Sequence, residues 1–372
     1  MTLRMTVEAT DGAARAGTIV TGRSSFETPA FMPVGTRGAV RTLAAPDLEA
    51  LGASVVLANT YHLMLRPGAT IVEQLGGLHR FMGWDGHVLT DSGGYQVFSL
   101  DPKVDDDGVT FRSTYDGSTH RLTPEDAVAV QAVLGADITM VLDVCPPWPA
   151  SDTELRTAVR RTAAWAQRAR VAHGQARVSG RAPAGQVQFG IVQGGIDPRL
   201  RVESATATIA IGFDGYGIGG LSVGEPRDLM LPALAATTAL LPADRPRYLM
   251  GVGDPMGLIE AIALGVDLFD CVLPTRFARH GTILTAAGRY NLKAAVNATD
   301  DGPLDAACPC PVCARWSRGY LRHLLMVSEP TGARLVTLHN LAWTFALVQS
   351  ARQAIRTGAL AALRSDIAAV WG

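Results

Sequence analysis

Eight short apolar runs, each stopping at a glycine or a polar residue, most tightly limit how this chain of 372 residues can fold. They are Ala30–Pro33, Ser54–Ala58, His87–Thr90, Ile138–Leu142, Val187–Val192, Gly215–Ile218, Tyr248–Gly251 and Val266–Phe269. Short apolar runs with such boundaries are typical of buried strands. Eight of them alternating with helices predict an α/β fold in which the parallel strands close into a (β/α)8 TIM barrel. A doubly wound open sheet is the alternative.

Several intervals between the runs carry signals for the start of a helix. Thr123 precedes Pro124 and two acidic residues, and Ser151 with Glu154 matches a capping box. Proline residues at 198, 226 and 255 mark three further predicted starts. The segment 167–186, rich in Arg, Gly and Ala, is expected to be the least regular part of the chain.

Polar residues and glycines follow the predicted strands where each one ends. These ends are Asn59–His62, Asp91–Gln96, Asp143–Cys145, Gln193–Gly195, Gly219–Ser222, Met250–Gly253 and Asp270–Cys271. In a parallel barrel all such ends meet on one face, which is where active sites of this fold are built. The sequence therefore predicts one pocket lined by three aspartates, a glutamine and several backbone amides.

The residues after Asp270 favour binding to a nucleic acid. From Cys271 to Thr299 there is no acidic residue, whereas Arg276, Arg279, Arg289 and Lys293 fall in this segment. The formal net charge of the chain is −1, so binding to phosphates depends on such a local patch. A carboxylate beside a basic segment indicates chemistry on a nucleic acid, with Asp270 as the nucleophile.

Three cysteines within six residues predict a structural zinc site. Cys308, Cys310 and Cys313 are followed by His339, and three thiolates with one imidazole make a closed tetrahedral site without room for a catalytic water. His323 is a rival fourth ligand that spacing barely separates from His339. Five cysteines in total, clustered in this way, favour a reducing compartment over a disulfide framework. We expect one Zn²⁺ per subunit.

Composition and the N-terminus set further limits. Hydrophobic residues make up 48% of the chain and charged residues 18%, which predicts a folded core and not general disorder. The first ten residues contain Arg4 and Glu8 and lack an apolar signal-peptide core, and no apolar run is long enough for a membrane helix. A cytoplasmic protein without membrane contact is expected.

Together these segments resemble the tRNA-guanine transglycosylases (queuine tRNA-ribosyltransferases), and more closely their bacterial form. The matching segments are Asn59–Leu63, Asp91–Phe98, Gly190–Gly195, Gly219–Glu225, Tyr248–Gly253, Phe269–Arg276, Cys308–Cys313, Ser317–His323 and His339–Leu341. They run in order along nearly the whole chain. The resemblance implies a barrel with a zinc subdomain inserted near the C-terminus. It also implies exchange of the wobble guanine of tRNA for a deazaguanine, without ATP or a redox cofactor.

The resemblance implies a role for each matching polar residue. Asp270 is expected to attack the ribose anomeric carbon and form a covalent intermediate, and Asp91 to act as the general base. Residues expected to bind the substrate base are Asp143, Gln193, Gly220, Leu221, Tyr95, Met250, Cys145 and Glu225. Among these, Tyr95 and Met250 are expected to stack on the base, and Glu225 to orient the Leu221–Ser222 peptide.

Partners and domain limits follow from the same resemblance. Arg276 and Arg279 are expected to hold the anticodon loop. A homodimer is expected, with Trp316, Tyr320 and His323 near the interface on one face of a helix. The domains are expected to be a barrel over residues 1–300, a zinc subdomain over 301–345 and a C-terminal helix over 346–372 that completes the barrel.

Departures from the bacterial pattern leave the substrate base open. Val144 stands where a glutamate is common, Trp148 replaces a tyrosine, Ser222 replaces an alanine and Phe277 a small polar residue. Cys145 favours 7-aminomethyl-7-deazaguanine (preQ1), used in queuosine biosynthesis. Direct exchange of queuine is the alternative. A non-catalytic partner subunit and a DNA-directed deazaguanine transferase are more distant alternatives, disfavoured by the retained aspartates and arginines.

Overall fold

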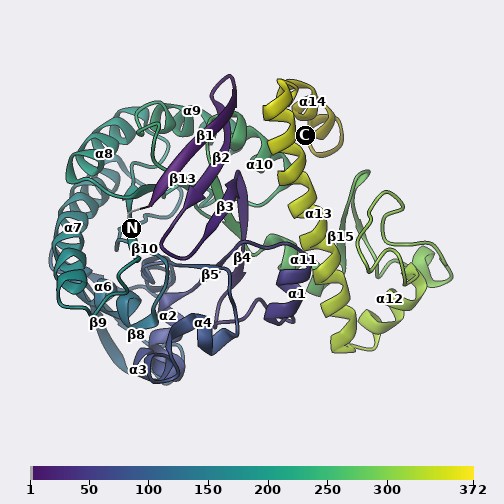
Figure 1. Cartoon of the computed structure of the whole chain (residues 1–372), viewed down its shortest axis with the longest axis horizontal. Helices are drawn as coiled ribbons and strands as arrows, with labels where there is room; N and C mark the ends of the chain where they lie inside the picture. Colours follow the sequence, from purple (N-terminus) through teal and green to yellow (C-terminus); the bar gives the residue numbers. More distant parts are fainter. Residues whose placement is uncertain (1–2) are drawn as a thin grey trace.

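A closed barrel of eight parallel strands forms the body of the molecule (Figure 1). The structure is a computed structural model that describes residues 3–372. The barrel strands are β4 (Ala30–Gly35), β5 (Val55–Ala58), β6 (His87–Thr90), β10 (Ile138–Met140), β11 (Val187–Val192), β12 (Gly215–Ile218), β13 (Arg247–Leu249) and β14 (Leu268–Cys271). β14 pairs with β4, and β6 pairs with β10, so the sheet has no free edge. The predicted (β/α)8 barrel is confirmed, and the open sheet is excluded.

Helices follow the barrel strands and surround them. They are α1 (Ala45–Ala50), α2 (Thr60–Leu63), α3 (Ala69–Gln74), α4 (Gly77–Met82), α5 (Gly94–Phe98), α6 (Pro124–Leu134), α7 (Asp152–Val178), α8 (Pro198–Ile211), α9 (Arg227–Thr238) and α10 (Pro255–Ala263). A π-helical turn, η1 (Met64–Gly68), joins α2 to α3. The N-cap predicted at Thr123 and the capping box predicted at Ser151 are present, and α8 and α10 begin at the predicted prolines. Pro226 is the N-cap of α9.

One expectation about regularity was wrong. Residues 167–178, expected to be irregular, continue α7 without a break to Val178. Ala166, Ala169 and His173 on this helix are buried, so tertiary packing stabilises a segment whose composition alone does not predict a helix.

Two small antiparallel sheets are added to the barrel. The first contains β1 (Arg4–Asp11), β2 (Ala14–Val20) and β3 (Ser25–Thr28), and the second contains β7 (Lys103–Val104), β8 (Val109–Arg112) and β9 (Thr119–Leu122). Arg15 on β2 donates to both carboxylate oxygens of Asp267, which precedes β14, at 2.8 and 2.6 Å. The first sheet therefore lies across the N-terminal end of the barrel, opposite the predicted active face.

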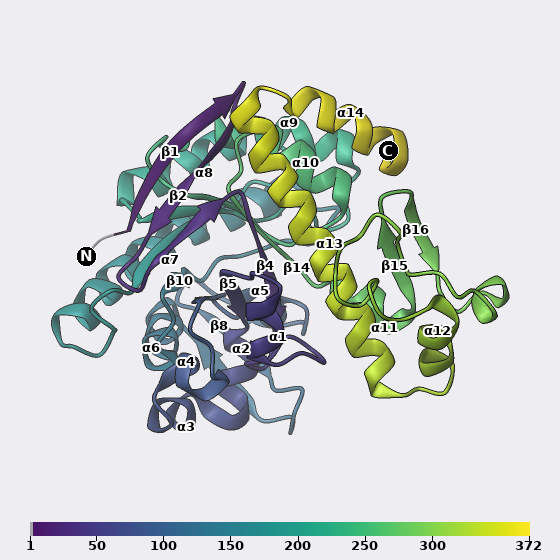
Figure 2. The same cartoon turned by 45° about the vertical axis from the view of Figure 1, so that its right-hand side comes forward.

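The remaining elements form a small subdomain and the C-terminus (Figure 2). They are α11 (Leu273–His280), β15 (Thr282–Thr285), β16 (Gly288–Asn291), the short 3₁₀ helix η2 (Ala295–Ala298), α12 (Arg318–Met326), α13 (Pro330–Thr357) and α14 (Leu360–Trp371). The subdomain has its own apolar cluster, which includes Ile283, Leu292, Leu321 and Val336. The first part of α13 packs on this cluster, whereas its later residues Leu347, Val348 and Ala351 pack on the barrel core.

The domain limits stay a prediction. The limit at 345 falls inside α13, and the hairpin of β15 and β16 packs with the small cluster although it precedes residue 301. Residues 1 and 2 of the predicted first domain lie outside the described residues. Among residues 3–372, the structure contains no helix with the length and apolar character needed to span a bilayer.

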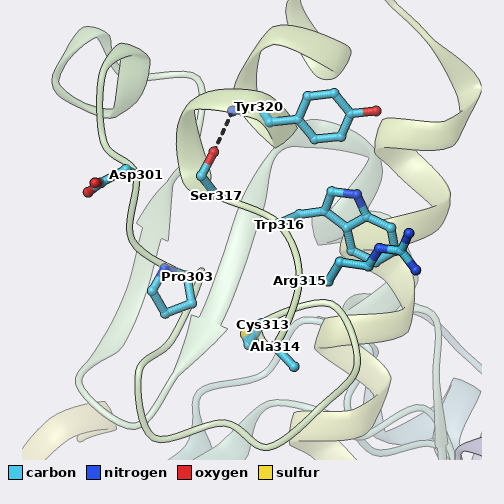
Figure 3. Close-up of a pocket in the computed structure, with 8 residues that line it drawn as sticks. All are labelled: Asp301, Pro303, Cys313, Ala314, Arg315, Trp316, Ser317 and Tyr320. Atoms are coloured by element: carbon cyan, nitrogen blue, oxygen red, sulfur yellow. Dashed lines mark hydrogen bonds between the residues drawn. The ribbon is translucent and has the colours of Figure 1, made fainter.

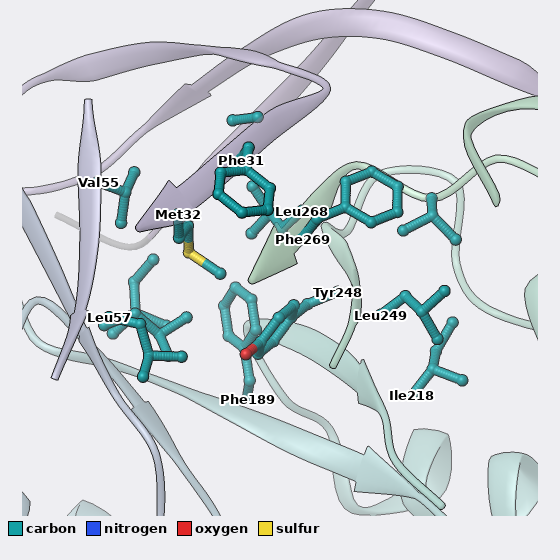
Figure 4. Packing of buried hydrophobic residues seen from close by; sticks show 14 of the residues in the cluster. Phe31, Met32, Val55, Leu57, Phe189, Ile218, Tyr248, Leu249, Leu268 and Phe269 are labelled. Atoms are coloured by element: carbon teal, nitrogen blue, oxygen red, sulfur yellow. The ribbon is translucent and has the colours of Figure 1, made fainter. Parts of the chain in front are cut away.

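Large buried side chains from different strands pack inside the barrel and between the barrel and its helices. Phe189, Tyr248 and Phe269 are fully buried and come from β11, β13 and β14 (Figure 4). Complete burial of an aromatic side chain of this size contributes about 1.5–3 kcal/mol to folding. Tyr248 differs from the other two because its hydroxyl needs a hydrogen-bond partner. It finds one in Asp270, which links the packed core to the active face.

Candidate active site

Asp270 lies in β14 with one of its two carboxylate oxygens fixed. Oδ1 accepts hydrogen bonds from the Tyr248 hydroxyl at 2.7 Å and from the Gly251 amide at 2.8 Å. Within residues 3–372, Oδ2 accepts no hydrogen bond from the protein. Burial is the main cause that raises the pKa of Asp270 above its usual value, and the nearby charge of Asp91 adds to it. The arrangement holds the carboxylate in place while leaving one oxygen free to react.

Asp91, directly after β6, is held by four donors. Oδ1 accepts from the amides of Thr60 and Gly93 at 2.7 and 3.2 Å, and Oδ2 accepts from the side-chain amides of Asn59 and Gln96 at 2.6 and 3.0 Å. Burial nevertheless raises the pKa of Asp91. A carboxylate whose proton affinity is raised is suited to accept a proton near neutral pH.

Asp143, after β10, contacts Gln193, after β11. The Gln193 Nε2 group donates to Asp143 Oδ2 at 2.6 Å, and both side chains are buried. Burial raises the pKa of Asp143 to about 6, and the charge of Asp91 acts in the same direction. A buried carboxylate next to an amide donor matches the edge of guanine, which offers N–H donors beside a carbonyl oxygen.

This raised pKa predicts a pH dependence for binding of the base. Below about pH 6 the Asp143 carboxyl becomes protonated and loses its capacity to accept two N–H bonds, so affinity falls as the pH is lowered. We expect the Kd for free guanine, measured by calorimetry, to rise roughly tenfold between pH 7 and pH 5. Asp143→Asn should remove most of this dependence. If the Kd of Asp143→Asn for guanine changed with pH as much as that of the wild type, the titrating group would be another residue.

Glu225 contacts the backbone next to Leu221, and its role in recognition of the base stays a prediction. Both carboxylate oxygens of Glu225 accept backbone amides, from Ser222 and from Val223, the latter at 2.9 Å. Ser222 has a φ of 60°, a left-handed conformation that costs a serine free energy and that these contacts hold in place. The N–H of the Leu221–Ser222 peptide is therefore directed at Glu225.

Gly220 must be glycine for two reasons. Its φ is 64°, and a Cβ atom there would lie 2.2 Å from Gln193 Oε1. The close approach brings the Gly220 amide and the Gln193 side chain to one place, and we call these two residues the carbonyl-binding edge after the role predicted for them, contact with the carbonyl oxygen of the base. Leu221 beside them is buried. Burial raises the pKa of the Cys145 thiol to about 12, so this thiol is neutral at physiological pH.

The two residues expected to stack on the base lie at the mouth of the barrel. Tyr95, on α5, is 62% exposed, and Met250, directly after β13, is partly buried. Their contact with a base stays a prediction. Val144 packs against the cluster that contains Trp165, and Val144 N–H donates to Thr162 at 3.0 Å. This position therefore contacts the helix layer around α7.

Arginines without acidic partners surround the mouth. Arg276 and Arg279 on α11, Arg37 and Arg41 after β4, and Arg66 in η1 form no ion pair within residues 3–372, and we call these five the mouth arginines. The charges of Arg41 and Arg276 both lower the pKa of Arg279, second to burial. The guanidinium carbons of Arg37 and Arg66 lie 5.4 and 4.7 Å from the centre of the Tyr115 ring. β14, β4 and β5 are neighbours in the barrel, so these residues form one continuous positive region.

Four side chains in the small subdomain form a candidate metal centre. The donor atoms of Cys308, Cys310, Cys313 and His339 lie within 4.8 Å of one another. His339 Nε2 is 2.8 Å from the Leu284 carbonyl oxygen, whereas Nδ1 is 3.3 Å from Cys313 Sγ and 3.5 Å from Cys310 Sγ. A proton on Nε2 leaves Nδ1 free to coordinate, and such a backbone contact is typical of zinc-ligating histidines. The donor set fits Zn²⁺, with His339 and not His323 as fourth ligand.

The aromatic residues of the subdomain do not all share a helix face. Trp316 precedes Ser317, the N-cap of α12, so the expected helical spacing of Trp316, Tyr320 and His323 was wrong for Trp316. The N-cap is satisfied because the Ser317 hydroxyl accepts the Tyr320 amide at 3.2 Å. A pocket of ≈ 430 Å³ lies here, away from the three aspartates, and Trp316 and Tyr320 border it (Figure 3).

Sequence reasoning missed two residues that hold the site. Tyr248 was noted only as part of a strand, although its hydroxyl fixes Asp270. Arg201, on α8, is fully buried beside the carbonyl-binding edge and has no acidic partner within residues 3–372. The sequence offered a signal for Tyr248, because it is a tyrosine with a polar hydroxyl in an otherwise apolar strand. An arginine near a helix start gave none for the second.

Comparisons with known proteins show which family this chain resembles along its length. The sequence model of a family described as queuine tRNA-ribosyltransferase matches residues 10–372. A protein named queuine tRNA-ribosyltransferase from Solidesulfovibrio magneticus is 51% identical over 366 residues, which cover 97% of this chain and 96% of that protein. Proteins with the same name from Desulforudis audaxviator and Geobacillus kaustophilus are 53% and 49% identical, covering 92% and 96% of this chain and 91% and 93% of their own lengths.

Proposed function

The chain belongs to the queuine tRNA-ribosyltransferase family, and we propose that it exchanges the wobble guanine of tRNA for preQ1 through a covalent Asp270–ribose intermediate. Transglycosylation of tRNA guanine follows from the family. The covalent step rests on one observation, that Asp270 has Oδ1 fixed by Tyr248 and Gly251 while Oδ2 accepts no bond from residues 3–372.

The first displacement releases guanine. Asp270 Oδ2 attacks the anomeric carbon of the ribose, the carbon–nitrogen bond to the base breaks, and its electron pair leaves with the base. An ionised carboxylate stabilises the oxocarbenium-like transition state. The two donors on Oδ1 restrict rotation of the carboxylate and so favour one angle of attack.

The second displacement uses Asp91. An incoming base must lose a proton before its nitrogen attacks the same carbon, and Asp91, with a pKa raised by burial, accepts that proton. The bond from the ribose to Asp270 then breaks, and its electrons return to the carboxylate. Two displacements at one carbon predict retained configuration and ping-pong kinetics.

The small space next to Gly220 and Glu225 supports preQ1 over queuine. A cavity of ≈ 20 Å³ is lined in part by Trp148, Gly220, Val223 and Glu225, and the Leu221–Ser222 peptide lies between two of these residues in the sequence. A cavity of this size holds about one water molecule. The two-atom aminomethyl group is closer in size to such a space, whereas the bulky ring substituent of queuine requires a larger rearrangement. Cys145, which the resemblance links to preQ1, supports the same choice.

The RNA lies across the mouth arginines in this proposal. Their positive charge, uncompensated by ion pairs, favours contact with the phosphates of the anticodon loop. Arg276 and Arg279, one turn apart on α11, directly follow the strand that carries Asp270. Binding at this position places the wobble nucleotide above the aspartates.

Replacement of one mouth arginine should change the salt dependence of tRNA binding. For Arg276→Gln we expect weaker binding and a slope of log K against log salt reduced by about 0.7–0.9, because one phosphate contact is lost. Filter binding at several salt concentrations measures both quantities. Arg356→Gln is a matched control, since Arg356 pairs with Glu8 and Glu27 near the opposite end of the barrel. An unchanged slope for Arg276→Gln would place the RNA elsewhere.

Zinc has a structural role in this proposal. When bound by Cys308, Cys310, Cys313 and His339, it cross-links the cysteine loop to α13 and leaves no open position for substrate. The metal thereby holds the subdomain, which follows directly on α11 and its arginines. No step of the exchange passes through it.

A homodimer through the small subdomain is supported by exposed apolar side chains. Tyr320, Met326 and Val327 on or next to α12 are 45%, 54% and 59% exposed, and Val296 in the adjacent η2 is 81% exposed. Such a group on a small subdomain is typical of an interface. Light scattering after gel filtration should give a dimer for the wild type and a monomer for Tyr320→Glu combined with Met326→Glu. A wild-type monomer at micromolar concentration would exclude it.

Base exchange tests the proposed function directly. Purified protein is incubated with tRNA that has guanine at the wobble position and with labelled guanine, preQ1 or queuine in parallel. We expect incorporation of preQ1 and guanine, and little incorporation of queuine. Incorporation of none of the three bases by folded, zinc-loaded protein would favour the partner-subunit or DNA-directed alternatives.

A further inference from the structure

Arg201 is a buried cation that the exchange reaction as described does not use. Its side chain is 0% exposed, and no carboxylate lies within ion-pair distance among residues 3–372. An unpaired charge in the interior is costly, so its presence requires an explanation. Burial lowers the pKa of the guanidinium to about 10, which leaves it protonated at neutral pH.

The guanidinium is bonded to the backbone around the base pocket. Nε donates to the Gly195 carbonyl at 2.7 Å, and Nη1 donates to the carbonyls of Gly219 and Val192 at 2.7 and 3.1 Å. All three carbonyls belong to the ends of β11 and β12 or the loops that follow them. Because the Gly219 carbonyl is drawn toward Arg201, the amide of the same peptide, on Gly220, is held in the opposite direction.

Two buried polar atoms near Gly220 lack partners. Arg201 Nη2 has no acceptor and Gln193 Oε1 has no donor within residues 3–372. A Cβ atom built on Gly220 would lie 2.2 Å from Gln193 Oε1 and 3.6 Å from Arg201 Nη2, so both atoms face the same side of this glycine. One is a donor and the other an acceptor. A contact between them, direct or through one water molecule, would satisfy both.

We propose that Arg201 is a positioning residue that orients the carbonyl-binding edge, and that this edge stabilises negative charge on a 6-oxopurine as it leaves. The inference rests on the proposed function. With Oε1 facing Arg201, one hydrogen of the Gln193 Nε2 group donates to Asp143, and the other is left for the carbonyl oxygen of the base, which would also accept from the Gly220 N–H. When the bond between the anomeric carbon and the base breaks, the electron pair spreads onto this oxygen. Donors aimed there, backed by a buried cation, favour the transition state.

Substitution of Arg201 should lower kcat more than it raises KM. Arg201→Lys keeps the charge and loses the planar set of donors, so we expect kcat for guanine exchange to fall about 10²-fold. KM for tRNA should stay within about threefold, because the RNA contacts are untouched. Arg15→Lys is the matched control. Arg15 is also buried and also donates to backbone carbonyls, but at the other end of the barrel. It should lower stability without a change in kcat.

A double-mutant cycle tests whether Arg201 acts through Gln193. If it does, Gln193→Met should lower kcat much less in the Arg201→Lys background than in the wild type. The loss of kcat caused by Arg201→Lys should also be smaller for an RNA with 8-azaguanine at the wobble position, because this base leaves as a more stable anion. Two results would overturn the proposal. One is additive losses of kcat in the double variant, and the other is an equal loss of kcat for guanine and 8-azaguanine as leaving bases.

Binding of free guanine separates this inference from the proposed function. Calorimetry should show about tenfold weaker binding to Arg201→Lys than to wild type, because the donors to the base carbonyl lose their orientation. This result does not depend on turnover. Absence of exchange by the wild type would remove the proposed function. Equal guanine affinity in both proteins would remove the role of Arg201.

Discussion

Asp270→Asn abolishes the covalent protein–RNA adduct and lowers base exchange by about 10³-fold or more, because the amide oxygen cannot displace the base. The asparagine still accepts the bonds from Tyr248 and Gly251. Burial raises the pKa of Asp270, so removal of its charge should leave the free energy of unfolding unchanged or higher. The affinity for tRNA should stay within about threefold of wild type, because the mouth arginines are intact.

The adduct is measured with labelled tRNA on a denaturing gel, and exchange by incorporation of labelled guanine. Asp267→Asn is an informative companion. Asp267 is fully buried and pairs with Arg15 at the opposite end of β14, so its loss should lower the free energy of unfolding by about 3–5 kcal/mol. The folded fraction should still form the adduct. Exchange at near wild-type rate by Asp270→Asn would show that the nucleophile is another residue.

Loss of the metal centre is the second large effect. Cys310→Ala removes one of four ligands, so we expect bound zinc to fall from one per chain to near zero and the subdomain to lose about 5 kcal/mol of stability or more. Its apolar cluster is small and includes Cys310 itself, so little else holds the loop between β16 and α12. Zinc is measured by atomic absorption, and local opening by amide exchange of residues 282–326.

His323→Ala is the matched control for the zinc prediction. His323 was the rival ligand by spacing, whereas only His339 joins the three cysteines. The variant should therefore keep its zinc. The barrel should stay folded in Cys310→Ala, because its core is a separate cluster. Full zinc content in Cys310→Ala would contradict the assignment of the ligands, and so would zinc loss in His323→Ala.

The sequence predicted the strands, most helix starts and the side chains that meet at the end of the barrel, because these features are encoded locally. Buried strands appear as apolar runs, and helix starts appear as capping residues within four positions of each other. Asp91, Asp143, Gln193 and Asp270 each directly follow such a run or end it. The parallel barrel then brings these ends together, so a local pattern was enough to predict which side chains share a pocket.

Errors occurred where local composition was weak and tertiary packing was strong. Residues 167–178 lack a clear helical pattern, but Ala169 and His173 are buried against the barrel, which stabilises the helix. Trp316 has a helical spacing to Tyr320 and yet precedes the helix, because Ser317 caps it. For residues 167–178, packing against the barrel outweighed the weak helical pattern. For Trp316, the capping hydrogen bond of Ser317 set the start of the helix.

The sequence alone determined the eight strands, the aspartates at their ends and the three thiolates of the metal centre. Only the tertiary structure showed that β14 pairs with β4 and that His339, not His323, joins the three cysteines. It also showed that the Tyr248 hydroxyl donates to Asp270 and that Arg201 is buried beside Gly220. The physical reason is separation along the chain. Local periodicity and capping depend on neighbours within a few residues, whereas hydrogen bonds between distant strand ends exist only once the barrel has closed.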